Sequence, residues 1–142
     1  MSHKSACIAA RIESFHGQGL DAHYAGFFDC FNRQLFYEAH EVLEDLWLQD
    51  KHGPNGVFYK GLIQFAGAFV HLQKNHPRPA AALFKLALAN LEKYPRWHEQ
   101  LDVAAACSLI RNWLGSLEAT HFERNPFTGG NAPKLALEPP HS

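Results

Sequence analysis

The stretch FYEAHEVLEDLW, residues 36–47, predicts a helix whose apolar face also carries a histidine and a carboxylate. At about 100° per residue, His40, Leu43 and Glu44 fall within one arc of about 100°, together with the aromatic residues at the two ends of the stretch. A core-facing stripe does not normally include a carboxylate, because burying one without a partner costs several kcal/mol. We therefore expect Glu44 to have a partner, and the candidates are His40, another helix, a metal ion or a ligand.

Outward from this stretch, apolar residues recur at helical spacing along most of the chain, and no segment of useful length alternates like a strand. The expected helices cover about residues 5–15, a segment from the N-cap Asp21 to a bend near residues 32–34, then about 36–51, 57–74, 79–94 and 99–122. The pattern therefore predicts an all-α fold, a compact irregular array of about five helices.

The C-terminal part has a different composition, because it becomes rich in Pro and Gly from Asn125 onward. We expect one helical domain over residues 1–124 and an extended strap over residues 125–142. The apolar residues Phe127, Leu135 and Leu137 indicate that this strap lies against the helices.

Composition excludes several classes of protein. Apolar residues make up 46% of the 142 residues and charged residues 19%, which is typical of a folded globular chain. The net charge is −1 and Lys and Arg do not cluster, so we expect neither a nucleic-acid partner nor an anionic membrane surface. The most apolar segment, residues 61–72, is too short and too polar to span a bilayer. The pattern leaves the oligomeric state open.

The cysteines and the N-terminus favour a cytoplasmic protein. Cys7, Cys30 and Cys107 are odd in number, widely spaced and form no CxxC motif, which predicts reduced thiols and not a disulfide framework. The first residues lack the long apolar core of a signal peptide.

A second line of polar residues follows on the helix expected over residues 57–74, at i, i+4, i+7, i+11 and i+14. Its members are Lys60, Gln64, Gly67, His71 and Lys74. If the two helices pack antiparallel, as their short connection favours, the His-Glu pair faces Gln64 or His71 across the space left by Gly67. The predicted pocket residues are His40, Glu41, Glu44, Trp47, Gln64 and His71.

Taken together, these motifs resemble the small all-helical family catalogued as domain of unknown function 309. The resemblance rests on residues 36–44 with Trp47, on Gly61-Leu62-Ile63-Gln64-Phe65-Ala66, on Phe31-Asn32 and on His71, and covers about Phe27 to Tyr94. It implies a compact multi-helical array with a pocket near the His-Glu helix, and it implies no activity.

A divalent metal is one candidate occupant of the pocket, because imidazole and carboxylate together suit Zn, Fe or Mn. The candidate ligands are His40, Glu44 and His71. However, the His-Glu-x-x-Glu pattern lacks the second imidazole of the His-Glu-x-x-His zinc proteases, and His71 could supply it only from another helix.

Two functions of different classes fit these residues. In the first, His40, Glu41 and Glu44 line a pocket that binds a small polar ligand or cation, with any chemistry left open. In the second, the chain is a non-catalytic helical interaction module, and the His/Glu cluster is a structural polar network. No Ser/His/Asp order, Walker loop or dinucleotide fingerprint is present, so whether the protein is an enzyme is left open.

Overall fold

The computed structural model describes residues 21–138, and this part of the chain is all-α, as predicted. Its elements are the helices α2 (Ala22–Asn32), α3 (Phe36–Asp50), α4 (Gly56–Gln73), α5 (Pro77–Leu91) and α6 (Val103–Ala119), with the short strands β1 (Trp97–His98) and β2 (Leu101–Asp102). The helix expected over residues 5–15 lies outside the described residues.

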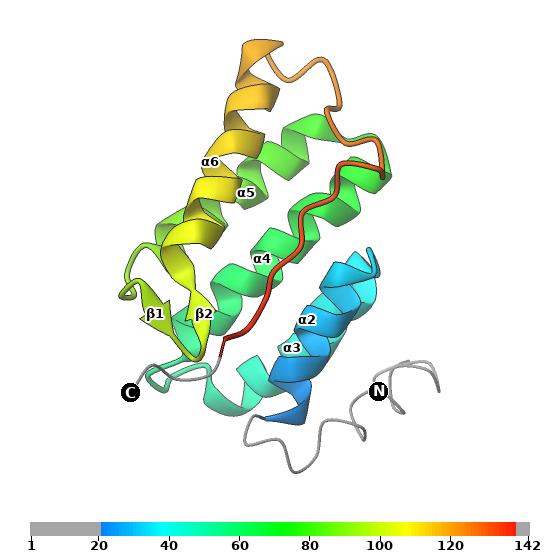
Figure 1. Cartoon of the computed structure of the whole chain (residues 1–142). Coiled ribbons are helices and arrows are strands. Elements are labelled where there is room, and N and C mark those ends of the chain that lie inside the picture. The colour runs from blue at the N-terminus through cyan, green and yellow to red at the C-terminus, as the bar shows by residue number, and fades with distance from the viewer. Residues whose placement is uncertain (1–20, 139–142) are drawn as a thin grey trace.

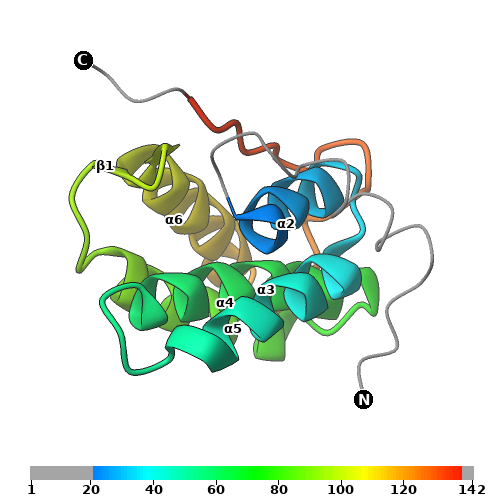
Figure 2. The ribbon, with the colours of Figure 1, turned by 90° about the horizontal axis from the view of Figure 1, so that it is seen from below.

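The helices form two layers (Figures 1 and 2). Helix α4 packs between α3 and α5, while α2 packs on α3 and α6 packs on α5. Seen from below, α3, α4 and α5 lie on one side of the molecule and α2 and α6 lie on the other. The central position of α4 follows from its sequence, because a helix that is apolar on much of its circumference must have several neighbours.

The core is built on the α4 stripe that faces α2 and α6. Its members, all buried, are Phe58, Leu62, Phe65, Phe69 and Leu72. The Phe69 ring contacts rings from all four other helices and from the strap. It stacks on Phe36 at 4.9 Å between centroids and meets Trp113 edge-on at 5.1 Å and Phe127 at 5.8 Å. Its other ring contacts are with Phe31 and Phe84. Aromatic packing therefore joins both layers and the C-terminal strap.

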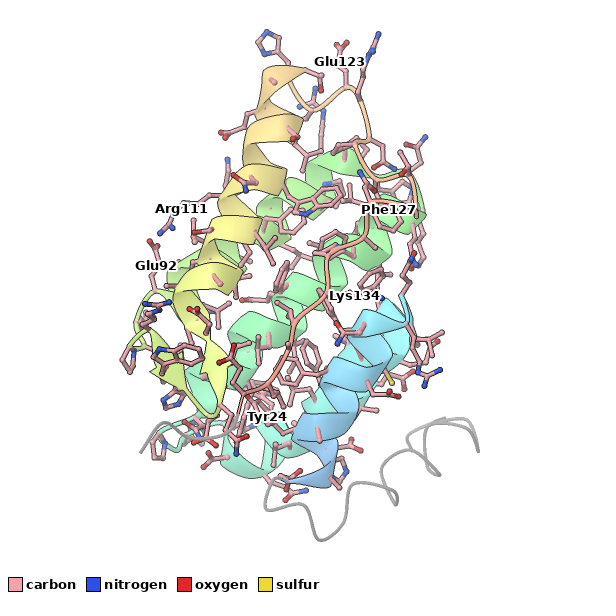
Figure 3. The ribbon with its side chains drawn as sticks, in the orientation of Figure 1. Tyr24, Glu92, Arg111, Glu123, Phe127 and Lys134 are labelled. Carbon is pink, nitrogen blue, oxygen red and sulfur yellow. The ribbon has the colours of Figure 1, made fainter. Side chains whose placement is uncertain are left out.

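The strap runs along the trough between α6 and α2, above α4 (Figure 1). Figure 3 labels Phe127 and Lys134 along it, and Phe127 packs on the core. Asn125 Nδ2 donates to the carbonyl of Leu72 at 2.6 Å, and Leu137 forms an isolated bridge with Leu101. The described part of the strap, residues 125–138, therefore contacts the rest of the fold at several points, as its apolar residues predicted.

Helix starts were predicted correctly at some places and wrongly at others. Asp21 is the N-cap of α2 and accepts hydrogen bonds from the backbone N–H groups of His23 and Tyr24, at 2.7 and 3.3 Å. Helix α5 begins at Pro77, two residues before the expected Pro79. Both positions suit the first turn of a helix, since proline lacks the N–H that has no intrahelical partner there.

The expected start of the last helix near residue 99 is wrong. Residues 97–102 form a small antiparallel hairpin in place of a helical turn, and Glu99 and Gln100 have positive φ angles of 49° and 63°. Helix α6 starts at Val103 with Asp102 as its N-cap, which accepts from the Ala105 N–H at 3.0 Å. This hydrogen bond is the main reason why the pKa of Asp102 lies below its ordinary value.

An ion pair at the surface also links the two layers. Arg111 of α6 and Glu92, the residue after α5, form an ion pair at 2.8 Å (Figure 3). Cys30 and Cys107 are both buried and are not joined to each other by a disulfide, while Cys7 lies outside the described residues. Among the helices of residues 21–138, none is long and apolar enough to cross a membrane.

Candidate functional site

A groove of about 280 Å³ lies on the face of α4 opposite its core stripe, between α3 and α5, and is called the α4 groove below. Its lining residues are Tyr37, His40, Lys60, Ile63, Gln64, Gly67, Val70, His71 and Leu83. Lys60, Gln64, Gly67 and His71 share this face because they repeat at i, i+4, i+7 and i+11. The groove therefore lies on the face of α4 that carries the line of polar residues identified in the sequence.

Gly67 keeps the middle of the groove hollow. A Cβ atom built on Gly67 would meet only the Leu83 Cδ1 atom of α5, at 3.2 Å, so a side chain there would extend into the space. Gln64 and His71, one turn before and after Gly67, consequently border an open space.

Gln64 is held in place from α5. Its Oε1 atom accepts a hydrogen bond from Asn90 Nδ2 at 2.7 Å. The pattern of α4 identifies Gln64, but it cannot identify Asn90, because a single asparagine on another helix carries no distinctive spacing. This bond fixes one edge of the groove and orients the amide of Gln64.

His40 comes from α3 and is only loosely paired. Its Nε2 atom lies 3.4 Å from Glu44 Oε2, and the two side chains are 32% and 43% exposed. Its ring also lies beside that of Tyr37, with 6.0 Å between the centroids. An i, i+4 pair with this much exposure stabilises a helix by only about 0.3–0.5 kcal/mol, so it is a weak structural link.

Two buried ring nitrogens at the groove lack partners within the described part of the chain: Nδ1 of His40 and Nδ1 of His71. Burial, with smaller contributions from His76 and Lys74, lowers the pKa of His71 below its ordinary value of 6.5. His71 is therefore neutral at pH 7, and a neutral imidazole can either donate or accept a hydrogen bond.

The expectation that Glu44 lies on the core stripe is wrong. The buried face of α3 is made by Phe36, Ala39, Val42 and Leu43. Its centre lies on the far side of Leu43 from Glu44, so the carboxylate falls at the edge of the interface and stays 43% exposed. Glu44 therefore does not need a buried counter-charge.

The other two predicted pocket residues also lie outside the lining set. Glu41 is half-buried on α3 but does not line the groove. Trp47 packs against the core, and its ring lies under the Lys60 ammonium, with 4.4 Å from Nζ to the ring centroid. Trp47 thus supports a lining residue that the predicted pocket set omitted, although Lys60 begins the same polar line as Gln64 and His71.

The three candidate metal ligands are not gathered into a ligand set. Within residues 21–138, no group of three or more His, Cys, Asp or Glu side chains is arranged to hold a metal ion. His40 and His71 both line the groove, whereas Glu44 lies outside it and pairs with His40.

Comparison with known proteins confirms the family resemblance. Residues 24–83 match the model of the family described as Domain of unknown function (DUF309), and all nine lining residues of the groove fall within this range. An uncharacterized protein of Aquifex aeolicus (strain VF5) is 28% identical over 106 residues, which cover 75% of this chain and 29% of that protein. The chain therefore matches less than a third of the length of this relative. No solved structure matches.

Proposed function

We propose that the α4 groove binds a small polar ligand. The proposal rests on the geometry of the groove, because the family that residues 24–83 match has no known function. The observation that carries the proposal is the pair of histidines: His40 of α3 and His71 of α4 line one cavity, and each has a buried ring nitrogen with no partner among residues 21–138. A buried polar atom without a partner costs free energy, so each such atom calls for an explanation, and a ligand that bonds to both nitrogens is one.

The size and lining of the groove suit a ligand of metabolite size. Its volume of about 280 Å³ lies just below the usual range of ligand pockets, about 300–1,000 Å³, and so suits only a small ligand. Ile63, Val70 and Leu83 supply apolar walls, and Tyr37 and Gln64 supply hydrogen-bonding groups. An apolar wall with a few polar groups is the usual composition of a small-molecule site.

The alternative function is a helical interaction module with a structural polar network. A network of that kind would satisfy the buried nitrogens of its own histidines, and the pairing of His40 with Glu44 leaves Nδ1 of the same ring without a partner in the described residues. This favours the ligand site. A cytoplasmic location is part of the proposal, supported by Cys30 and Cys107, which are buried and form no disulfide with each other.

Filling the groove tests the proposal. In the full chain labelled with ¹⁵N, a library of small polar fragments should shift the NMR signals of Tyr37, His40 and His71. Gly67→Leu should abolish these shifts by occupying the cavity. Gly115→Leu is the matched control, because a Cβ at Gly115 on α6 meets nothing within 4 Å and lies outside the groove.

The outcomes separate the two functions. Shifts that map to the groove in the wild type and in Gly115→Leu, but not in Gly67→Leu, would support the ligand site. Shifts that persist in Gly67→Leu, or that map to other surfaces while the groove residues stay unchanged, would overturn it and leave the interaction module.

A further inference from the structure

The charge in the α4 groove has one sign. Its nine lining residues include Lys60 and two histidines, and none of them is Asp or Glu. Glu44 lies outside the lining set, where it contacts His40. Lys60 is the only lining residue with a permanent charge, and its ammonium forms no ion pair within the described part of the chain.

The position of this ammonium is fixed from α3. Lys60 is half-buried, and its Nζ atom lies 4.4 Å above the Trp47 ring centroid. A cation–π contact holds the charge in place but does not neutralise it. A half-buried cation without a counter-ion attracts an anion and repels a second cation, so the groove does not suit the cationic ligand that the sequence left open.

Charge and apolar surface are separated along the groove. Lys60 and His71 are eleven residues apart on α4, which places them about 16.5 Å from each other along the helix axis. Between them lie the apolar side chains of Ile63, Val70 and Leu83. The groove is therefore elongated, with a positive charge at one end and an apolar wall in the middle.

We infer, on the basis of the function proposed above, that the ligand of the α4 groove is a small amphipathic carboxylate. Its acid group pairs with the Lys60 ammonium, and its apolar part lies against Ile63 and Leu83. The hollow at Gly67 admits a chain of a few carbon atoms at the depth of these side chains.

Three probes of the same length test this charge preference by NMR titration of the full chain: hexanoate, hexan-1-ol and hexylammonium. Hexanoate should bind at the groove at least about tenfold more tightly than hexan-1-ol, and hexylammonium should bind most weakly. Lys60→Met keeps the side-chain length and removes the charge. It should weaken hexanoate binding about tenfold and leave hexan-1-ol binding unchanged. Lys93→Met, at an exposed lysine outside the groove, is the matched control.

Failure of the inference and failure of the proposed function give different results. If hexan-1-ol or hexylammonium binds the groove as tightly as hexanoate, the carboxylate inference is overturned and the groove remains a ligand site. If Lys60→Met and Lys93→Met weaken hexanoate binding equally, the effect is one of net charge and the inference is again overturned. If none of the three probes shifts a groove signal, the inference also fails. The fragment experiment with Gly67→Leu then decides the proposed function separately.

Discussion

Asn32 and Leu135 are joined by two hydrogen bonds across 103 residues of sequence. Asn32 Nδ2 donates to the Leu135 carbonyl and the Leu135 N–H donates to Asn32 Oδ1, both at 2.7 Å. The side-chain amide thus pairs with the strap as the backbone of a neighbouring strand would. The pairing provides hydrogen-bond partners for the backbone N–H and C=O of Leu135, which has no strand partner at that point. It also keeps the Leu135 side chain buried.

Removing the Asn32 amide should therefore release the strap. Asn32→Ala leaves the N–H and C=O of Leu135 without their partners, and we expect a loss of about 1–3 kcal/mol in the free energy of unfolding. Hydrogen exchange followed by mass spectrometry should be faster over residues 126–138. Ser108→Ala, at an exposed position of α6, is the control and should change neither quantity. Unchanged exchange of the strap in Asn32→Ala would contradict the role of this pair.

The aromatic core makes a second prediction. Phe65 is fully buried on α4, and its ring lies 5.2 Å from that of Phe31 and 5.6 Å from that of Phe69. Phe65→Ala should reduce the free energy of unfolding by about 3–5 kcal/mol, because it removes buried apolar area and leaves a cavity. Urea unfolding of the variant measures this loss. A loss below about 1 kcal/mol would be incompatible with a buried position.

The exposure of Glu44 predicts a small effect. Glu44→Gln removes a charge from a side chain that is 43% exposed and 3.4 Å from His40 Nε2. We expect the free energy of unfolding, measured by thermal unfolding at neutral pH, to change by less than about 0.5 kcal/mol, because an exposed i, i+4 pair usually contributes no more than this. A loss of several kcal/mol would show that this carboxylate has a structural role that its surface position does not explain.

His71 predicts how stability depends on pH. Its pKa in the folded chain lies below the ordinary value of 6.5, so the unfolded chain binds a proton more readily than the folded chain does. Stability should therefore fall as the pH decreases through about 6.5 towards the folded pKa of His71, and it should change no further from this group below that value.

His71→Gln isolates this contribution. Chemical unfolding gives the free energy of unfolding of wild type and variant between about pH 5 and 8, the range in which histidine titrates. This free energy should decline less on the acid side for the variant than for the wild type. NMR titration of the His71 ring in the wild type gives its pKa directly. A value above 6.5 would reverse the sign of the predicted slope.

The parts of the fold that were predicted correctly depend on local patterns. The stripe from Phe58 to Leu72 marks α4 because its period is that of a helix, and Asp21 marks a helix start because its side chain caps the next turn. The hairpin at residues 97–102 has no comparable signal. Its strands have two residues each, too few for an alternating pattern, and its turn uses Glu99 and Gln100 at positive φ, where glycine or asparagine is usual.

The candidate site was predictable on α4 and, on α3, at His40. The spacing of Gln64, Gly67 and His71 identifies one face of α4, since these positions repeat at helical intervals. The wall formed by Leu83 on α5 depends on which helices flank α4, and this is set by packing across the whole core. The misplacement of Glu44 has the same origin, because an arc of α3 that contains Leu43 can be centred on either side of it until the neighbouring helices are known.

The contact between Lys60 and Trp47 gives the groove its own optical probe. An indole emits at a wavelength that depends on the electric field across its ring, and here a full positive charge stands 4.4 Å above the ring centroid. Any occupant that draws this ammonium aside changes that field. Trp97 and Trp113 lie outside the groove and supply a constant background, so a fluorimeter can follow occupation of the groove in the unlabelled protein.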